Sequence, residues 1–458
     1  MTIRFRRYQQ RMIREQKKFM ADPLRHRATV LAATGAGKTE VFLHLISTVF
    51  QQMDQARILI AHPRIALSQD QQKRFAKRLG HFCPEFTSFH SGHQKYHTLP
   101  DRKNLSTTRV DQLEEIRSLT PGHHITFSSY ASLHKIAALD YDVIICDEAH
   151  YLTQADLRQN LHLFRAKTLF YTGTPVQVAA AAESMDNIEL FGDVIAQVPP
   201  SELIPYGFVV PPRLRTINIK NLRRNDTYDY PRIIARAYQD QRTHAHSSFN
   251  HKMLVSMPRT GDFDSIMQEL ALMRLESGCL DLDVYYVTAD RAVKNGAPLR
   301  DRETALTDFS DNTRPCVIIH CDTLAEGIDV DGLGGVLVMR GLGMVKAIQT
   351  MGRGCRPARA DVKKNGEIRK RRIKAECIVT LARVDGEWTS DARIREWAEI
   401  FRVAGYGNLW DFYDRPPAER AGDTEIGAPD DRVFDIIEDI RISDGADTLW
   451  SELFGEEA

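Results

Sequence analysis

The sequence predicts an α/β protein built on two parallel β-sheets, each buried between layers of helices. In the first half, short apolar runs rich in β-branched residues alternate with amphipathic stretches, which is typical of βα units that build a parallel sheet. A proline-rich break over residues 198–213 interrupts this alternation. From His251 onward the alternation resumes. A second α/β layer of similar size is therefore expected.

The apolar runs give the expected strands. In the first half these are residues 27–33, 56–63, 123–130, 141–148 and 167–175, and in the second half residues 252–258, 282–290, 315–322, 334–341 and 376–384. The polar stretch 221–250 is interpreted as a linker and a helix, and residues 393–405 as a further helix. The expected domains are residues 1–205, residues 206–385, and a helical and acidic extension over residues 386–458.

Composition narrows the class of protein. The 458 residues are enough for two full domains. No apolar run is long enough to span a bilayer, and the N-terminal residues lack the apolar core of a secretory signal. None of the seven cysteines forms a CxxC pair, so neither a zinc ribbon nor a disulfide framework is indicated. A cytoplasmic protein without a membrane partner is expected.

The charge is unevenly distributed along the chain. The totals of 61 basic and 61 acidic residues give a net charge of zero. From Ala421 onward there are 12 acidic and 2 basic residues, a balance of −10, which leaves 59 basic and 49 acidic residues, or +10, for the rest. A basic body with an acidic tail is a frequent pattern in proteins that bind nucleic acid.

A glycine-rich segment from Leu31 to Glu40 follows the first expected strand. It contains Thr34, Gly35, Ala36, Gly37, Lys38 and Thr39. An apolar strand, a glycine turn and a Lys-Thr pair deliver backbone N–H groups and an ammonium to a triphosphate at a helix N-terminus. Ala32 stands where the common pattern has its first glycine, so the strict pattern is not met. Lys38 is expected to reach the β- and γ-phosphates, and Thr39 to place its hydroxyl on Mg²⁺.

A second segment, residues 143–150, is an apolar strand that ends in two carboxylates. Asp147 is expected to hold Mg²⁺ directly or through water, and Glu148 to act as the base or to orient the attacking water. His150 is expected to contact the second domain or the segment near Thr172 and to act as a sensor. Together the two segments predict ATP hydrolysis with ATP and Mg²⁺ as cofactors.

Further motifs resemble those of superfamily 2 helicases, in order over residues 5–385. Arg6 and Gln9 lie in a segment similar to the adenine-reading element, and Thr172, Gly173 and Thr174 in one similar to the element that couples hydrolysis to strand movement. Segments 324–329 and 349–357 match the two signatures of the second domain, and supply Gly327, Asp329, Gln349, Arg353 and Arg356. Within the superfamily the resemblance is closest to DEAH-type XPB/RadD/UvsW-like DNA helicases, although the zinc-free C-terminus departs from RadD.

The resemblance implies two tandem RecA-like domains with an ATP cleft between them. Arg353 and Arg356 would then act as arginine fingers, and because they lie three residues apart they would share one face of a helix. Asp329 would contact the ribose from the second domain. The expected nucleic-acid contacts are Pro63, Arg64, Gln69, Ser91, Gly92, Ser129, Arg259 and Thr323. Contacts to phosphates imply salt-sensitive binding that is largely independent of sequence.

The leading interpretation is an ATP-dependent DNA helicase or translocase that works in repair, recombination or replication. Two alternatives stay open. One is an RNA helicase with the same ATPase, and the other is a motor subunit that moves on duplex without separating its strands. DNA is the preferred partner over RNA.

Three weaker signals also stay open. Residues 362–374 place Asn365 and Gly366 between two basic strands, which indicates a hairpin that is either a nucleic-acid contact or a solvated loop. His90, His93 and His97 have metal-like spacing but no accompanying carboxylate or cysteine. The acidic tail ends in an amphipathic segment that either mimics nucleic acid, recruits a protein partner or packs on the second domain.

Overall fold

The computed structural model of the chain separates into two compact units, Met1–Val198 and Pro199–Ala458. Each unit is an α/β layer structure, so the predicted fold class is confirmed. The structure describes residues 5–63, 65–90, 105–175, 184–219, 223–224, 227–244, 251–258, 263–288, 290–321, 333–340, 342, 344–356, 359–364, 367–372, 377–384, 397, 400–402, 404 and 406. The domain boundaries placed after residues 205 and 385 stay predictions.

The first unit is built on an eight-stranded sheet in the order β4-β3-β5-β2-β6-β7-β1-β8, and all its pairings are parallel. The strands are β1 (Arg27–Ala32), β2 (Arg57–His62), β3 (Glu85–Phe89), β4 (Leu105–Thr107), β5 (His124–Ser129), β6 (Val143–Asp147), β7 (Lys167–Thr172) and β8 (Asp193–Val198). The strands predicted for the first half correspond to β1, β2, β5, β6 and β7. No apolar run in the sequence had predicted β3, β4 or β8.

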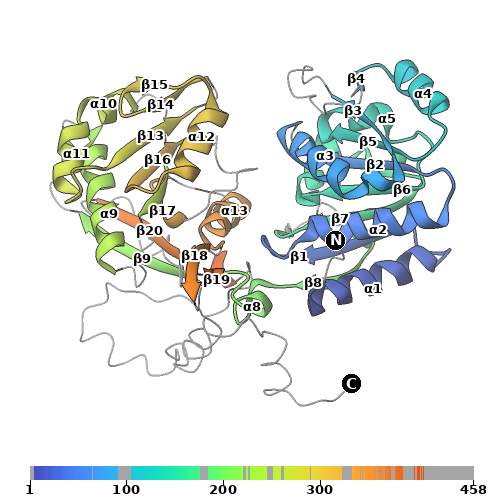
Figure 1. Cartoon of the computed structure of the whole chain (residues 1–458), viewed down its shortest axis with the longest axis horizontal. Helices are drawn as coiled ribbons and strands as arrows, with labels where there is room; N and C mark the ends of the chain where they lie inside the picture. The colour runs from blue at the N-terminus through green and yellow to red at the C-terminus, as the bar shows by residue number, and fades with distance from the viewer. Residues whose placement is uncertain are drawn as a thin grey trace, which may run out of the picture. The chain divides into compact units, whose positions relative to one another are not determined.

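Helices cover both faces of this sheet. They are α1 (Arg7–Ala21), α2 (Lys38–Gln52), α3 (Ile65–Leu79), α4 (Val110–Leu119), α5 (Leu133–Ile136), α6 (Ala155–Arg158) and α7 (Ile188–Phe191), with short 3₁₀ turns at Gly80–Phe82, Tyr130–Ser132, Ala149–Thr153 and Leu161–Leu163. Figure 1 shows α1 and α2 running side by side along the sheet.

Alternating side chains of the central strands supply two separate cores. On one face, Phe42 of α2 packs on Tyr171 of β7 with ring centroids 5.2 Å apart and on Phe75 of α3 at 5.9 Å. On the opposite face, Ile144 and Phe170 belong to a cluster of buried side chains from α5, the 3₁₀ turns and α7. Because the strands are buried on both faces, they are continuous apolar runs in the sequence, as expected of a parallel sheet.

Gly192, between α7 and β8, is a described position of this unit where a side chain is poorly tolerated. Its φ is 69°, and a Cβ there would lie 2.1 Å from the Arg27 carbonyl oxygen. Gly192→Ala is expected to lower the free energy of unfolding by at least about 2 kcal/mol, because backbone strain and a backbone clash add. Urea denaturation measures the loss. Gly296→Ala is the matched control, because φ is 84° there but nothing lies within 4 Å. A loss for Gly192→Ala no larger than that of the control would contradict the clash.

The second unit is built on a mixed eight-stranded sheet in the order β15-β14-β13-β16-β12-β17-β20-β9. Its strands are β9 (Pro212–Ile219), β12 (Lys252–Ser256), β13 (Asp283–Val287), β14 (Ala292–Lys294), β15 (Ala297–Pro298), β16 (Cys316–His320), β17 (Leu333–Val338) and β20 (Cys377–Val384). The pairings of β14 are antiparallel, and the other pairings are parallel. All the strands predicted for the second half are present as β12, β13, β16, β17 and β20.

The helices of this unit are α8 (Pro200–Leu203), α9 (Tyr230–His244), α10 (Phe263–Gln268), α11 (Leu270–Glu276), α12 (Arg302–Asp311) and α13 (Met344–Gly354). Figure 1 shows α9, α10 and α11 on one face of the sheet and α12 and α13 on the other. The first face is closed by one large core in which Tyr238 and Phe263 pack with strand residues such as Val255. On the second face, Phe309 of α12 meets Tyr285 of β13 edge to face, with ring centroids 5.4 Å apart.

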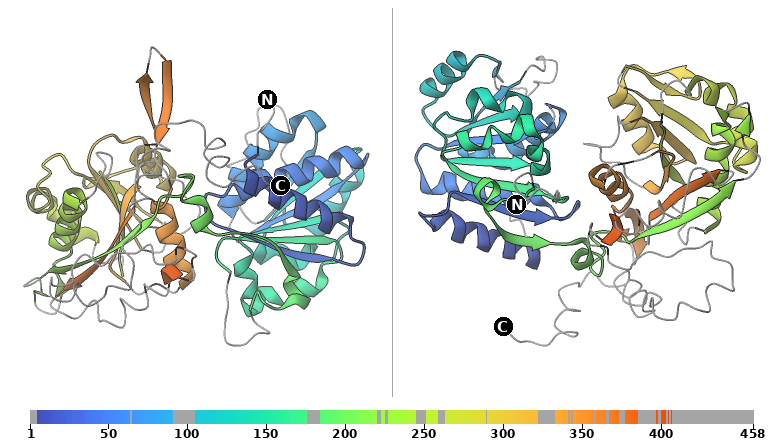
Figure 2. Two further views of the ribbon diagram at one scale, coloured as in Figure 1. Left: turned by 90° about the horizontal axis from the view of Figure 1, so that it is seen from below. Right: turned by 180° about the vertical axis from the view of Figure 1, so that it is seen from behind.

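Two small hairpins stand apart from the main sheets. One pairs β10 (Arg223–Arg224) with β11 (Thr227–Tyr228). The other pairs β18 (Arg359–Lys364) with β19 (Glu367–Arg372), and its register closes at Lys364 opposite Glu367. The hairpin predicted around Asn365 and Gly366 is therefore confirmed. Figure 2 shows β18 and β19 as a separate two-stranded ribbon.

The chain passes from the first unit to the second through residues 199–211, and each end of this connector is held by a hydrogen bond within one unit. The Val198 carbonyl, at the end of β8, accepts a hydrogen bond from Ala33 N at 3.0 Å. Val210 N donates to the Cys355 carbonyl at 2.8 Å, directly after α13 ends. Both anchoring residues, Ala33 and Cys355, belong to segments that the sequence assigns to the ATP site.

Candidate functional site

The glycine-rich segment forms a tight loop between β1 and α2. Gly35 and Gly37 have φ values of 89° and 78°, in the left-handed region that favours glycine. A Cβ on Gly37 would also lie 2.6 Å from Gln9 Nε2. The loop therefore needs glycine at position 37 for both backbone conformation and space. It leads into the N-terminus of α2, where backbone N–H groups attract anions.

The predicted base-reading glutamine lies against this loop. Gln9 Nε2 donates to the Ala36 carbonyl at 3.2 Å, and Gln9 Oε1 accepts from Arg6 N at 3.0 Å. The Arg6 guanidinium donates to the Tyr8 hydroxyl at 2.7 Å. The start of α1 is thereby attached to the phosphate loop, although the two are far apart in sequence.

Lys38, the first residue of α2, is held at the base of the loop. Its Nζ donates to the Ala32 carbonyl at 3.1 Å and lies 3.9 Å from Glu148 Oε1, with 10% of the side chain exposed. An ammonium near one carboxylate and one carbonyl has donors left for a phosphate oxygen. The structure thus brings together the lysine and the acidic pair that the sequence predicted as one site.

The acidic pair lies where β6 ends. Asp147 is its last residue, and Glu148 turns the chain away with a φ of 54°, an uncommon conformation for a residue with a side chain. The Tyr130 hydroxyl donates to the Asp147 carbonyl at 2.6 Å, and Gln71 Nε2 donates to Asp147 Oδ2 at 2.7 Å. Burial and then the neighbouring Glu148 raise the pKa of Asp147 to about 6.

This donor set fits Mg²⁺ bound together with a nucleotide. A buried carboxylate whose pKa is raised by burial and by a second carboxylate is stabilised by a nearby cation. Thr39 follows Lys38 at the start of α2. Within the described ranges, no group of three or more His, Cys, Asp and Glu side chains is arranged to hold a metal ion. Mg²⁺ commonly takes one or two protein ligands and completes its shell with phosphate oxygens and water.

His150 connects the acidic pair to the segment 172–174. Its Nδ1 lies 2.9 Å from Thr172 Oγ1, 3.1 Å from Thr174 Oγ1 and 3.5 Å from Glu148 Oε2. Burial lowers the pKa of His150, which favours the neutral imidazole at pH 7. The predicted contact of His150 with the segment near Thr172 is present.

Gly173 lies in the same segment, directly beside the phosphate loop. A Cβ at Gly173 would lie 3.0 Å from the Ala32 carbonyl oxygen and 3.4 Å from Lys38 Nζ. The segment 172–174 therefore lies beside Lys38 on one side and contacts His150 on the other.

Sequence reasoning missed the role of two residues around Asp147. Tyr130 directly follows Ser129, one of the expected nucleic-acid contacts, yet its hydroxyl donates a hydrogen bond to the Asp147 carbonyl. Gln71 was not singled out, because its partner lies 76 residues away and no spacing rule relates α3 to the end of β6.

Replacing Gln71 by Leu is expected to raise the pKa of Asp147 further, because the amide of Gln71 donates to the ionised carboxylate and lowers its pKa. A carboxyl whose pKa is higher in the folded state than in the unfolded chain destabilises the fold as pH rises through that folded pKa. The unfolding free energy of the metal-free Gln71→Leu variant should therefore fall more between pH 5 and pH 8 than that of the original protein. The extra fall is expected to be about 1–3 kcal/mol, measured by urea denaturation in EDTA.

Gln72→Leu is the matched control. Gln72 is the next residue of α3 and is also buried, but it accepts from Ser88 Oγ at 3.3 Å instead of touching Asp147. An equal change of pH dependence in both variants would show that Gln71 has no specific effect on Asp147.

The second unit positions the remaining predicted catalytic residues on and after α13. Gln349 lies inside the helix, and Arg353 lies in its last turn with 8% of its surface exposed. The expectation that Arg353 and Arg356 share a helix face is wrong, because α13 ends at Gly354. Arg356 lies in the turn that follows, where its N–H donates to the Arg353 carbonyl at 3.4 Å.

The predicted nucleic-acid contacts are only partly described. Pro63 follows β2 and Ser129 ends β5, and the pairing of His62 with Ser129 brings the two strand ends together at one edge of the sheet. Gln69 lies on α3, but its side chain is not among the described ones. The other predicted contacts and ATP-site residues that lie outside the described residues are Arg64, Ser91, Gly92, Arg259, Thr323, Gly327 and Asp329. His93, His97 and the acidic tail lie outside them too.

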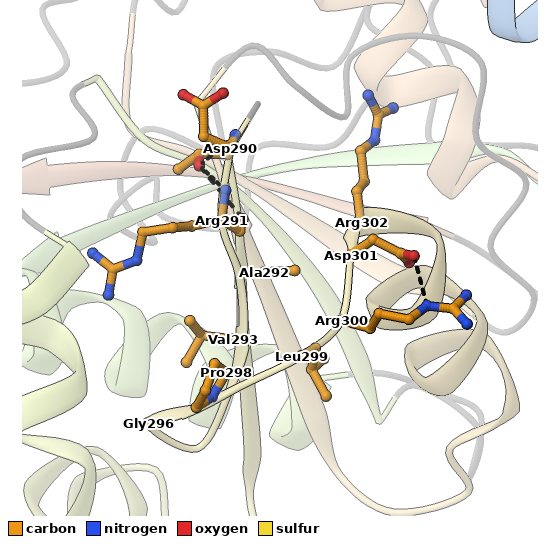
Figure 3. Close-up of a pocket in the computed structure, with 11 residues that line it drawn as sticks. Asp290, Arg291, Ala292, Val293, Gly296, Pro298, Leu299, Arg300, Asp301 and Arg302 are labelled. Atoms are coloured by element: carbon orange, nitrogen blue, oxygen red, sulfur yellow. Dashed lines mark hydrogen bonds and ion pairs between the residues drawn. The ribbon is translucent and has the colours of Figure 1, made fainter. Parts of the chain in front are cut away.

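A pocket of about 460 Å³ lies in the second unit, between the end of β13 and the start of α12. Figure 3 shows its three arginines, Arg291, Arg300 and Arg302, pointing in different directions. The Arg291 guanidinium lies 3.2 Å from Asp264, and the Arg300 guanidinium lies 2.8 Å from Asp301. These arginines do not converge on one point, and two of them are paired with carboxylates, so their arrangement does not indicate a second phosphate site.

Over the part of the chain that the structure describes, every helix is too short or too polar to cross a bilayer.

Most of the first unit is similar to a known protein family. Residues 2–177 match the family model ResIII, described as the type III restriction enzyme res subunit. Among curated proteins, none matches this sequence.

Solved structures share the fold at low sequence identity. The DNA-bound ATP-dependent type ISP restriction-modification enzyme LlaBIII is 15% identical with a TM-score of 0.68 over 96% of this chain. A putative HsdR subunit fragment of a type I restriction enzyme from Vibrio vulnificus is 18% identical, with a TM-score of 0.51 over 84% of this chain and 70% of its own length. S. cerevisiae Dbp5 bound to RNA and ADP BeF3 is 11% identical, with a TM-score of 0.51 over 95% of this chain and 93% of its own length.

The chain spans 32% of the length of LlaBIII, so the activity of that whole enzyme is not transferred here. At these identities the likeness shows the fold alone: two α/β units, consistent with tandem RecA-like domains. The family match covers most of the first unit, including Lys38 and the acidic pair that lies beside it. Residues 2–177 thus resemble the superfamily 2 helicase-like ResIII domain of restriction enzymes.

Proposed function

We propose that this chain is an ATP-dependent motor that moves along DNA. The observation that carries the proposal is the cluster in the first unit in which Lys38, Glu148 and His150 lie within hydrogen-bond or ion-pair distance of one another or of the segment 172–174. Lysine for phosphate, carboxylate for water and a buried histidine that contacts a further loop are the parts of a hydrolysis site coupled to movement.

In this proposal Lys38 binds the β- and γ-phosphates, while Thr39 and Asp147 hold Mg²⁺. Mg²⁺ bound with the nucleotide neutralises charge on the phosphate oxygens. Glu148 orients the attacking water, and it is more accessible than Asp147, as a water-binding group must be. Neutral His150 relays the state of this carboxylate to Thr172 and Thr174.

The second unit is proposed to complete the site with Arg353, with Arg356 and Gln349 nearby in the chain. Gln9 is proposed to read the adenine, and Gly327 and Asp329 to contribute from the second unit. Pro63, Arg64, Gln69, Ser91, Gly92, Ser129, Arg259 and Thr323 are proposed as nucleic-acid contacts. The domain resemblance to the XPB/RadD/UvsW-like group and the role in repair, recombination or replication stay predictions.

DNA is favoured as the track over RNA, because the family matched by residues 2–177 is a restriction-enzyme subunit and the LlaBIII structure contains DNA. Among the alternatives that the sequence leaves open, we favour a motor subunit that moves on duplex DNA without separating its strands, because the matched family and structures are restriction enzymes. ATP hydrolysis should therefore be stimulated most by double-stranded DNA.

The test compares ATP turnover with single-stranded DNA, duplex DNA and RNA of equal length. A triplex-displacement assay beside a strand-displacement assay then distinguishes translocation on duplex from unwinding. Triplex displacement without strand displacement is the expected result. Stimulation by RNA alone would support the RNA-helicase alternative, and no stimulation by any nucleic acid would end the proposal.

A further inference from the structure

The ribbon β18–β19 is the most basic element that the second unit presents apart from its main sheet. Residues 359–364 and 367–372 contain seven Lys and Arg residues and two acidic residues, so the balance is 7 − 2 = +5. Within the described part of the chain its twelve residues pair with one another, in a two-stranded sheet separate from the eight-stranded one. Figure 2 shows this ribbon standing clear of the sheet of its own unit.

The register sorts these charges onto two faces, because residues directly opposite each other in a ladder belong to the same face. Arg359 is opposite Arg372, Asp361 opposite Lys370, and Lys363 opposite Ile368. We call the face formed by these three pairs the double-arginine face. It has four basic residues and one acidic residue, so its formal net charge is +3. The other face has Ala360 opposite Arg371, Val362 opposite Arg369, and Lys364 opposite Glu367, with a balance of 3 − 1 = +2.

This arrangement works against the stability of the ribbon. An isolated two-stranded hairpin is only marginally stable in water. Like charges directly opposite each other, such as Arg359 and Arg372, destabilise the pair. A polyanion placed along the ribbon converts this repulsion into attraction, so the composition favours a phosphate backbone as the partner.

The dimensions suit duplex DNA. Six residues per strand extend the ribbon by roughly 20 Å. The major groove of B-form DNA, about 12 Å wide, admits a two-stranded β-ribbon, whereas the deep and narrow groove of A-form RNA does not. Contacts to phosphates at the groove edges carry no base specificity, as movement along a track requires.

We propose that β18–β19 grips the phosphates of duplex DNA through its double-arginine face. This inference rests on the proposed function, since it names the part of the second unit that holds the track. It adds a duplex contact separate from the strand-end loops of the first unit. The ribbon lies between α13, which carries Arg353, and β20, so a grip on duplex would be in direct chain continuity with the proposed arginine finger.

The test measures the affinity for a duplex of fixed length at several salt concentrations. The variant Arg359→Gln, Lys370→Gln, Arg372→Gln removes three charges from the double-arginine face. Its matched control, Lys364→Gln, Arg369→Gln, Arg371→Gln, removes one lysine and two arginines from the other face. We expect the first variant to lower the log–log salt slope by about 2–3, since each phosphate contact contributes about 0.9. The control should lower it by less than 1.

A charge-preserving variant, Arg359→Lys with Arg372→Lys, should keep most of the slope and thereby separate loss of charge from loss of structure. Folding of each variant is checked by its thermal unfolding midpoint, which removal of opposed like charges should not lower. Equal slopes for the original protein and the double-arginine variant would overturn the grip. Equal losses in both triple variants would overturn the assignment to one face.

Failure of the proposed motor function and failure of the ribbon inference give different experimental results. If the original chain shows no DNA-stimulated ATP turnover, the proposed function fails, whatever the ribbon does. If turnover is stimulated but the salt slope does not depend on the ribbon, only the ribbon inference fails. A ribbon that separates strands would instead show up as lost strand displacement with an unchanged duplex salt slope.

Discussion

Lys38→Ala is expected to reduce ATP turnover by at least about 100-fold and to weaken nucleotide binding. In the proposed site Lys38 supplies the charged donor to the phosphates, and loss of a single preorganised donor typically costs 10²–10³ in rate. Glu148→Gln is expected to lose roughly 10²–10⁴ in turnover while nucleotide binding persists, because a water-orienting group acts on the chemical step. Single-turnover ATPase assays, beside equilibrium binding of a fluorescent ATP analogue, separate the two effects.

Both substitutions should preserve the fold. Lys38 Nζ donates a hydrogen bond to the carbonyl of Ala32 at the end of β1. The Glu148 carboxylate is partly exposed and lies near Lys38 and His150. Far-UV circular dichroism and the unfolding midpoint provide the control. Normal turnover in either variant, with the fold intact, would refute the assignment of the site.

Arg353→Ala should have the second large effect. A guanidinium that stabilises the charge on a transferring phosphoryl group is worth roughly 10³–10⁵ in rate. We expect a loss in this range, with nucleotide binding reduced far less, because the first unit holds the phosphate loop on its own. Arg353→Lys should recover little, since an ammonium lacks the planar fork of the guanidinium.

Because Arg353 is largely buried, its removal is compared with two references. Arg300→Ala removes an exposed arginine of the same unit that is paired with Asp301, and should leave turnover unaffected. The unfolding midpoint of Arg353→Ala reports any structural loss. A midpoint and turnover close to those of the original protein would show that hydrolysis does not use this arginine.

The central strands could be predicted because each is a continuous apolar run. A strand buried on both faces needs apolar residues at nearly every position, as in β6 with Val143 and Ile145. The strands that escaped prediction are near the edges of their sheets. β8 has exposed residues at Asp193 and Val194, and β3 contains Thr87 and Ser88, so neither has the expected pattern.

The chemistry of the candidate site was predictable where the motif is local. Lys38 and Thr39 follow a glycine turn whose conformation the structure shows at Gly35 and Gly37. The supporting contacts were not predictable, because they join distant segments. Gln9 to Ala36 and Gln71 to Asp147 arise only when helices pack on the sheet, and no local spacing encodes them.

The end of α13 shows the same limit. Spacing of three residues indicates a shared helix face only if the helix continues, and α13 ends between Arg353 and Arg356. Gly354 packs so closely that an added Cβ would overlap Cys377 Sγ at 2.1 Å. The helix thus ends where it packs against β20, a contact that no spacing within the motif encodes.

The connector is held at both ends by hydrogen bonds, so movement at one anchor can be passed along the covalent chain to the other. A shift of the phosphate loop moves Ala33 and, through its hydrogen bond, the carbonyl of Val198. At the far end, Val210 holds Cys355, two residues beyond Arg353. If the chain is the proposed motor, movement that nucleotide binding causes at Ala33 would reach the segment of Arg353 along these residues, and lengthening the connector with Gly-Ser insertions should weaken that coupling while leaving both anchors in place.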